Sequence, residues 1–107
     1  MNPNNQQVLF ANANESLLKE VVLQMEKDLE MSGNKHQFIS SNPAELIIEL
    51  KKVLAVIDNI GKMQSLLYRI DLNINKMEIG EDFYHSLSLF VWDRILQKVW
   101  FRKQFGG

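Results

Sequence analysis

The feature that most constrains the fold is how few residues in this chain can turn a backbone. The 107 residues include two prolines and five glycines, and two of those glycines are the last two residues. An all-β domain needs a turn about every 8–12 residues. Apolar residues instead recur three and four residues apart over long stretches, which is the period of amphipathic helices. We therefore predict an all-α fold, a compact bundle of three to four helices.

The first predicted helix covers residues 14–31. Its apolar stripe is spaced by four, three and four residues and consists of Leu18, Val22, Met25 and Leu29, with Leu17 and Val21 beside it. The segment 32–34, Ser-Gly-Asn, supplies a stop signal. We expect residues 1–13 to be flexible or partly helical.

The second predicted helix, residues 43–59, has the clearest start. Asn42 is a favourable N-cap, Pro43 suits the first helical position, and Glu45 stands three residues after the cap, as in a capping box. Its apolar stripe consists of Leu46, Leu50, Val53, Ile57 and Ile60, widened by Ile47 and Leu54.

The segment 58–61, Asp-Asn-Ile-Gly, favours a break after this helix and a separate short helix over 62–71. A single bent helix is the alternative, because Met63, Leu67 and Ile70 continue the stripe in phase. Residues 72–80 are expected to form a connection. A last helix is predicted over 81–104, where two acidic residues at its start suit a helix N-terminus.

Composition limits the classes of site that the chain can carry. Apolar residues make up 46 % and charged residues 23 %, which is typical of one globular domain, here residues 1–107. The absence of cysteine excludes disulfides, thiolate nucleophiles and cysteine-ligated metals. A formal charge of −1 gives no overall field toward nucleic acid or anionic membranes.

The chain shows no targeting or membrane-spanning pattern. Residues 1–7 hold no basic residue and no long apolar run follows them, so we expect no secretory signal. Acidic or basic residues interrupt every apolar stretch within a few residues, which is incompatible with a spanning helix. We therefore expect a cytoplasmic protein that does not bind membranes.

The last predicted helix is unusually aromatic, since residues 83–105 hold seven of the ten aromatic side chains. At about 100° per residue, the aromatic and aliphatic residues of this helix fall on two apolar sides rather than one. One side holds Phe83, Leu87, Phe90, Phe101 and Phe105, and the other holds Trp92, Ile95, Leu96, Val99 and Trp100. Such a helix is either the centre of the bundle or covered on one side by a second chain.

We predict a non-catalytic protein–protein interaction or self-association module that uses this helix. Aromatic and arginine side chains are enriched at interface centres, and two-fold homodimers are the commonest assembly. The predicted partner is therefore protein, with a homodimer favoured. The candidate interface residues are Phe90, Arg94, Lys98, Phe101, Arg102 and Phe105.

The alternative function is binding of nucleic acid through the basic row of the same helix. Arg94, Lys98 and Arg102 fall on one side, beside aromatic rings that can stack on bases, and Lys103 adds a fourth charge. The patch is small, and long basic side chains often cover aromatic surface instead. Nucleic-acid binding is therefore the less favoured prediction.

No motif predicts catalysis, so we expect no enzyme activity, cofactor, metal or small-molecule ligand. The histidines are His36, in a predicted loop, and His85, which has carboxylates at residues 78, 81 and 82 before it. Bundle metal sites draw ligands from several helices, and no second histidine has matching spacing. Neither a phosphate-binding glycine loop nor a nucleophile elbow is present.

The segment 66–71, Leu-Leu-Tyr-Arg-Ile-Asp, is expected to close the short helix, with Tyr68 docked on the bundle and a charged hydrogen bond at the corner. With the stretch 97–99, Gln-Lys-Val, and the basic residues after it, it resembles a family of small uncharacterised bacterial helical proteins. The likeness covers residues 43–105. It implies a helical fold, and that family has no assigned activity to carry over.

Overall fold

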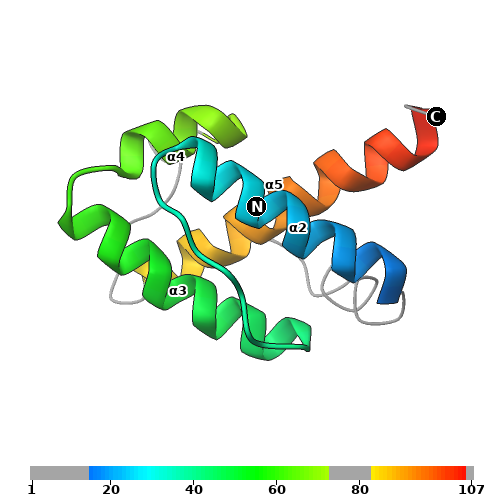
Figure 1. Ribbon diagram of the computed structural model, residues 1–107, viewed down its shortest axis with the longest axis horizontal. Helices are drawn as coiled ribbons and strands as arrows, with labels where there is room; N and C mark the ends of the chain where they lie inside the picture. Colours follow the sequence, from blue (N-terminus) through cyan, green and yellow to red (C-terminus); the bar gives the residue numbers. More distant parts are fainter. Residues whose placement is uncertain (1–14, 73–82, 106–107) are drawn as a thin grey trace.

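Helices make up the regular structure of residues 15–72 and 83–105, the part of the chain described by this computed structural model (Figure 1). In chain order they are α2 (Glu15–Met31), α3 (Pro43–Asn59), α4 (Met63–Ile70) and α5 (Phe83–Phe105). The described residues include no strand, and the predicted all-α class is confirmed. The expectations for residues 1–13, for 73–80 and for the two acidic residues at 81 and 82 lie outside the described residues.

Helix α3 begins where its capping residues predict. The Asn42 side chain accepts a hydrogen bond from the Glu45 backbone N–H at 2.9 Å, with Asn42 itself extended (φ −122°, ψ 156°) and Pro43 at the helix start. This bond satisfies one of the N–H groups that a helix start leaves unpaired.

A separate α4 follows because the chain turns sharply at Gly61. Its φ of +76° lies in the left-handed region, which a glycine adopts without steric cost. The Lys62 N–H then returns to the Ile57 carbonyl at 3.0 Å, as in a Schellman ending. Ile60 was predicted to belong to the apolar stripe, but it is exposed, because it lies after the last helical residue and leaves the helical phase.

The core forms where the apolar sides of the four helices pack against one another. In α2 the fully buried apolar residues are Leu17, Val21, Met25 and Leu29, whereas Leu18 and Val22 are only partly buried. The stripe is therefore rotated slightly from the predicted one. In α3 the buried residues are Pro43, Leu46, Ile47, Leu50, Leu54 and Ile57, with Val53 at the edge.

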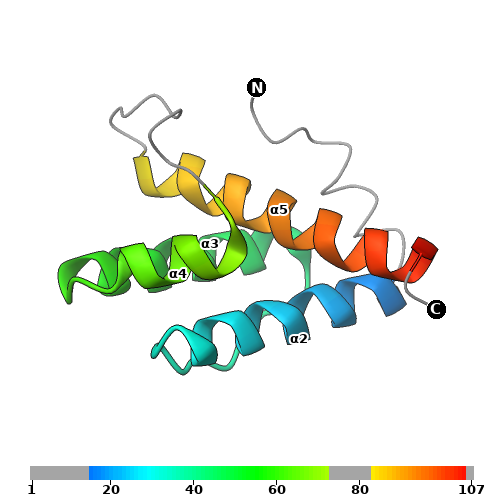
Figure 2. The same cartoon turned by 90° about the horizontal axis from the view of Figure 1, so that it is seen from above.

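Helix α5 is the element that the other three share. It contacts α2, α3 and α4, and it crosses the bundle along its length (Figure 1, Figure 2). Its buried residues are Leu87, Ser88, Val91, Trp92, Ile95, Leu96 and Val99. Its last turns extend past α3 and α4 in both views and have α2 on one side. The helix is therefore central over residues 87–99 and open at its C-terminal end.

The corner after α4 differs from the prediction in one respect. Tyr68 was expected to dock on the bundle, but it is 90 % exposed, because the inner side of this short helix is filled by the aliphatic residues around it. The corner is tied instead by Arg94, whose Nε donates to the Ile70 carbonyl at 3.1 Å and whose Nη2 donates to Asp71 at 3.4 Å. Asp71 is left-handed, with φ of +58°.

Among the described helices, none has the combination of length and apolar character needed to cross a membrane.

Candidate interaction surface

Five of the six predicted interface residues lie together along one side of α5. Together with Gln97 they form an open groove, called here the α5 groove, lined by Arg94, Gln97, Lys98, Phe101, Arg102 and Phe105. These positions share one side of the helix because they are separated by three, four, seven, eight and eleven residues from the first. Phe90, the sixth predicted residue, is half-buried and does not line the groove.

The aromatic part of the groove faces solvent. Phe101 is 60 % and Phe105 73 % exposed, and their ring centroids lie 4.7 Å apart. Trp100 is also exposed, 6.4 Å from the Phe101 ring. These residues follow Val99, the last buried residue of α5, at the end of the helix that α3 and α4 do not cover. Clustered exposed aromatic rings typically mark an interaction site.

The basic residues of the groove are held by acceptors of the same chain. Lys98 Nζ donates to Asp28 Oδ2 at 3.1 Å, and Arg102 Nη1 donates to Gln24 Oε1 at 2.9 Å. Outside the groove, Lys103 forms an ion pair with Glu20 at 2.5 Å. With the bonds of Arg94 at the α4 corner, all four predicted phosphate-binding residues therefore have intramolecular partners.

Asp28 was not among the predicted site residues. Its side chain is fully buried, and besides Lys98 it accepts from Arg69 Nε at 3.4 Å and from Gln24 Nε2 at 3.0 Å. A buried carboxylate is tolerated only when such charged partners replace its water. This cluster joins α2, α4 and α5 directly beneath the groove.

A signal for this cluster was present in the sequence. Positions 17, 21, 24 and 28 of α2 form one helical stripe, and the first two are buried leucine and valine. Gln24 and Asp28 therefore occupy core positions of that stripe. Polar residues at such positions indicate a buried polar cluster that needs partners from neighbouring helices.

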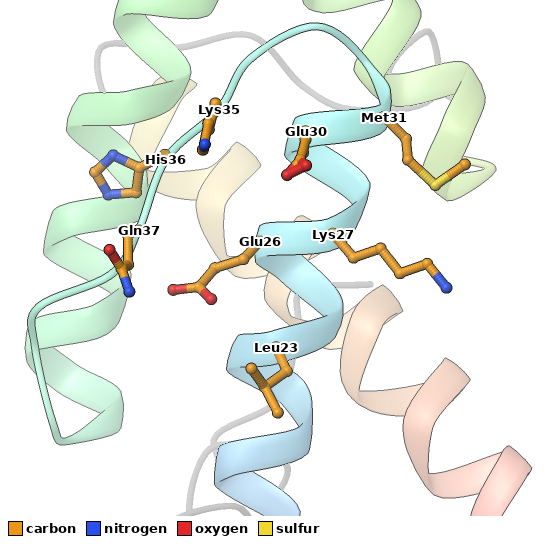
Figure 3. Close-up of a pocket in the computed structure, with 8 residues that line it drawn as sticks. All are labelled: Leu23, Glu26, Lys27, Glu30, Met31, Lys35, His36 and Gln37. Carbon is orange, nitrogen blue, oxygen red and sulfur yellow. The ribbon is translucent and has the colours of Figure 1, made fainter.

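A second groove lies between α2 and the extended segment 34–41 (Figure 3). Its volume is about 640 Å³, and Figure 3 shows its lining side chains: Leu23, Glu26, Lys27, Glu30, Met31, Lys35, His36 and Gln37. The acidic and basic side chains are equal in number apart from the histidine, so the groove has no strong preference for a ligand of one charge.

Two carboxylates hold the segment beside this groove. Glu26 accepts from the Phe38 N–H at 2.8 Å. Glu49 accepts from the N–H groups of Ile39 and Ser40, from the Ser40 hydroxyl at 2.7 Å, and contacts His36 Nε2 at 2.7 Å. Burial alone raises the pKa of Glu49. The hydrogen bonds from Ser40, His36 and Ile39 lower it by a larger amount, so its pKa lies below the ordinary value.

The arrangement at Glu49 does not resemble a catalytic triad. In a triad the histidine lies between the hydroxyl and the carboxylate, so that it can take the hydroxyl proton. Here the carboxylate lies between Ser40 and His36 and fixes both. Within residues 15–72 and 83–105, no cluster of three or more potential ligand side chains is placed to hold a metal ion. The carboxylates at 78, 81 and 82, considered with His85, lie outside the described residues.

The resemblance to small bacterial helical proteins stays a prediction. Comparisons of this chain with protein-family models, with curated proteins and with solved structures found no match.

Proposed function

We propose that the protein is a non-catalytic self-association module, a homodimer formed through the α5 groove. The observation that carries the proposal is the exposure of Phe101 and Phe105 side by side at the uncovered end of the central helix. Burying these rings against a second copy removes them from water without any rearrangement of the core. Large aromatic side chains supply much of the binding energy at protein interfaces.

The size of the aromatic surface sets the expected affinity. The exposed fractions of Phe101 and Phe105 correspond to roughly 270 Å² per copy, if each ring side chain offers about 200 Å². A stable interface buries about 800 Å² per partner. The rings alone supply about a third of that, so we expect a weak dimer whose population rises with protein concentration in the micromolar range.

Nucleic-acid binding receives less support. Arg94, Lys98, Arg102 and Lys103 each donate to an acceptor within the chain. Phosphates would have to compete with these acceptors, including a buried carboxylate. The two functions differ in their response to salt, because phosphate binding weakens steeply as salt rises, whereas an aromatic contact changes little.

The proposal is tested by changing the aromatic rings and measuring molar mass. The double variant Phe101→Asp, Phe105→Asp removes both rings and should be monomeric by size-exclusion chromatography with light scattering. The matched control is Ile48→Asp with Val56→Asp, which adds the same charge at exposed apolar residues of α3. It should dimerise like the wild type.

Circular dichroism should show that both variants remain helical. A wild type that stays monomeric into the millimolar range contradicts the proposal. So does a dimer that the two aspartates leave unchanged.

A further inference from the structure

The six residues of the α5 groove are spaced symmetrically about its midpoint. Consider a two-fold axis perpendicular to α5 that passes between Val99 and Trp100, midway along the groove. In an antiparallel pair of helices this axis brings residue 94 of one copy opposite residue 105 of the other, 97 opposite 102, and 98 opposite 101. Every residue that lines the groove then faces another residue that lines it.

We propose that two copies pair through α5 in this antiparallel orientation, with Arg94 of each copy over the Phe105 ring of the other. The inference rests on the proposed self-association and adds the register and orientation of the two helices. A two-fold interface must be complementary to itself. The three facing pairs, 94 with 105, 97 with 102 and 98 with 101, are complementary in their chemistry.

Arg94 is suited to stack on a ring because two nitrogens of its guanidinium already donate in the plane of the group. Nε and Nη2 point to the Ile70 carbonyl and to Asp71. The two flat faces of a guanidinium remain available for an aromatic ring while its edges donate hydrogen bonds. Phe105 is the most exposed of the three aromatic residues near the end of α5, and it lies at the other end of the groove.

The second pair joins Gln97 to Arg102. The Gln97 amide nitrogen donates to Asp93 at 3.0 Å. The side-chain carbonyl oxygen of Gln97 is then the atom that can accept a hydrogen bond from a second copy. Arg102 uses Nη1 for Gln24 and keeps further N–H groups. An amide oxygen opposite a guanidinium is a favourable hydrogen-bonding pair.

The third pair, Lys98 with Phe101, lies closest to the axis and raises the question of like charges. The two Lys98 residues would be only about 4.5 Å apart along the helix direction. Asp28 holds each ammonium toward α2 and supplies a negative charge beside it, at 3.1 Å. The Lys98 stem is then left to cover the Phe101 ring, as long basic side chains commonly do.

Parallel pairing lacks this complementarity. In a parallel pair each residue of the groove lies opposite itself, so Arg94, Lys98 and Arg102 would each face a like charge. Juxtaposed like charges act against an orientation. The order of charges and rings along the groove therefore favours the antiparallel pair.

Cysteine cross-linking tests the orientation cleanly, because the chain contains no cysteine of its own. Two full-length variants are made, Arg94→Cys and Phe105→Cys, and each is oxidised alone and as an equal mixture. In the antiparallel pair the two thiols of one variant lie about 16.5 Å apart along the helix direction, whereas a disulfide needs Cα atoms within about 7 Å.

The mixture should therefore give a disulfide-linked mixed dimer, formed roughly tenfold or more faster than any dimer of one variant, because pairing brings the thiols to millimolar effective concentration. The mixed dimer also keeps one intact contact between Arg94 and Phe105. A second pair, Gln97→Cys with Arg102→Cys, should give the same pattern and covers the case in which loss of Arg94 weakens the α4 corner.

The outcomes separate this inference from the proposed function. Rapid cross-linking of each variant with itself, with no preference for the mixed dimer in the mixture, would show a dimer with parallel helices and overturn the inference alone. A wild type that dimerises by light scattering while neither cysteine pair links preferentially in the mixture would also overturn it. A monomeric wild type would overturn both.

Discussion

Replacing Asp28 by asparagine should lower the stability of the fold markedly although the side chain hardly changes in shape. Asp28→Asn keeps the volume but removes a fully buried charge that accepts from Lys98 at 3.1 Å, from Arg69 at 3.4 Å and from Gln24 at 3.0 Å. The asparagine also turns an NH₂ group toward two cations. The perturbation therefore acts on electrostatics and hydrogen bonding, with little effect on packing.

The magnitude follows from the burial of the partners. Removing one member of a fully buried ion pair costs about 3–5 kcal/mol. Lys98 and Arg69 are 33 % and 37 % exposed, so water can hydrate them once Asp28 is neutral. We therefore expect the free energy of unfolding to fall by about 2–3 kcal/mol, near the value of one or two hydrogen bonds to charged groups.

The assay is urea denaturation followed by circular dichroism, at protein concentrations low enough for the monomer to dominate. The control Asp71→Asn removes a carboxylate that is 90 % exposed and bonded to Arg94 at 3.4 Å, and it should cost under about 0.5 kcal/mol. Combining Asp28→Asn with Lys98→Met should cost less than the sum of the two changes, because they share one interaction. A loss under about 0.5 kcal/mol for Asp28→Asn, equal to its control, would refute the reasoning.

Three further predictions concern the fold. The pKa of Glu49 is lower in the folded protein than its ordinary value of 4.5, so the stabilising effect of its carboxylate is full at neutral pH and is lost as pH falls below that value. Glu49→Gln should therefore weaken the dependence of the urea midpoint on pH in the acid range, and an unchanged dependence would contradict this. Asn42→Ala should lower the free energy of unfolding by about 1 kcal/mol through loss of the cap, whereas no change would mean that the bond to Glu45 does not stabilise α3. Leu50→Ala and Ile57→Ala should each cost about 2–5 kcal/mol in the same assay, and a negligible loss at both would place that side of α3 in water.

Local chemistry made much of the fold predictable. The start of α3 depends on neighbouring residues alone, since Asn42 caps the turn that Pro43 begins. The separate α4 depends on the left-handed conformation of Gly61, a property of that residue type. Both features can be derived without knowledge of the tertiary structure.

Features that depend on other helices were not predictable in this way. Periodicity sorts residues by polarity, so Asp28 was not recognised as buried, and its partners come from α4 and α5. The exposure of Tyr68 depends on how α4 is rotated against the core. The grouping of Arg94, Lys98, Phe101, Arg102 and Phe105 was predicted from helical spacing, but the acceptors that hold their cations were not.

The proposed function requires that the exposed end of α5 contacts a second copy of this chain. Sedimentation equilibrium of the unmodified protein, from low micromolar to millimolar concentration, measures this directly. We predict that the apparent mass rises from 12.5 kDa toward twice that value as the concentration increases. A mass that stays at 12.5 kDa throughout would contradict self-association through α5.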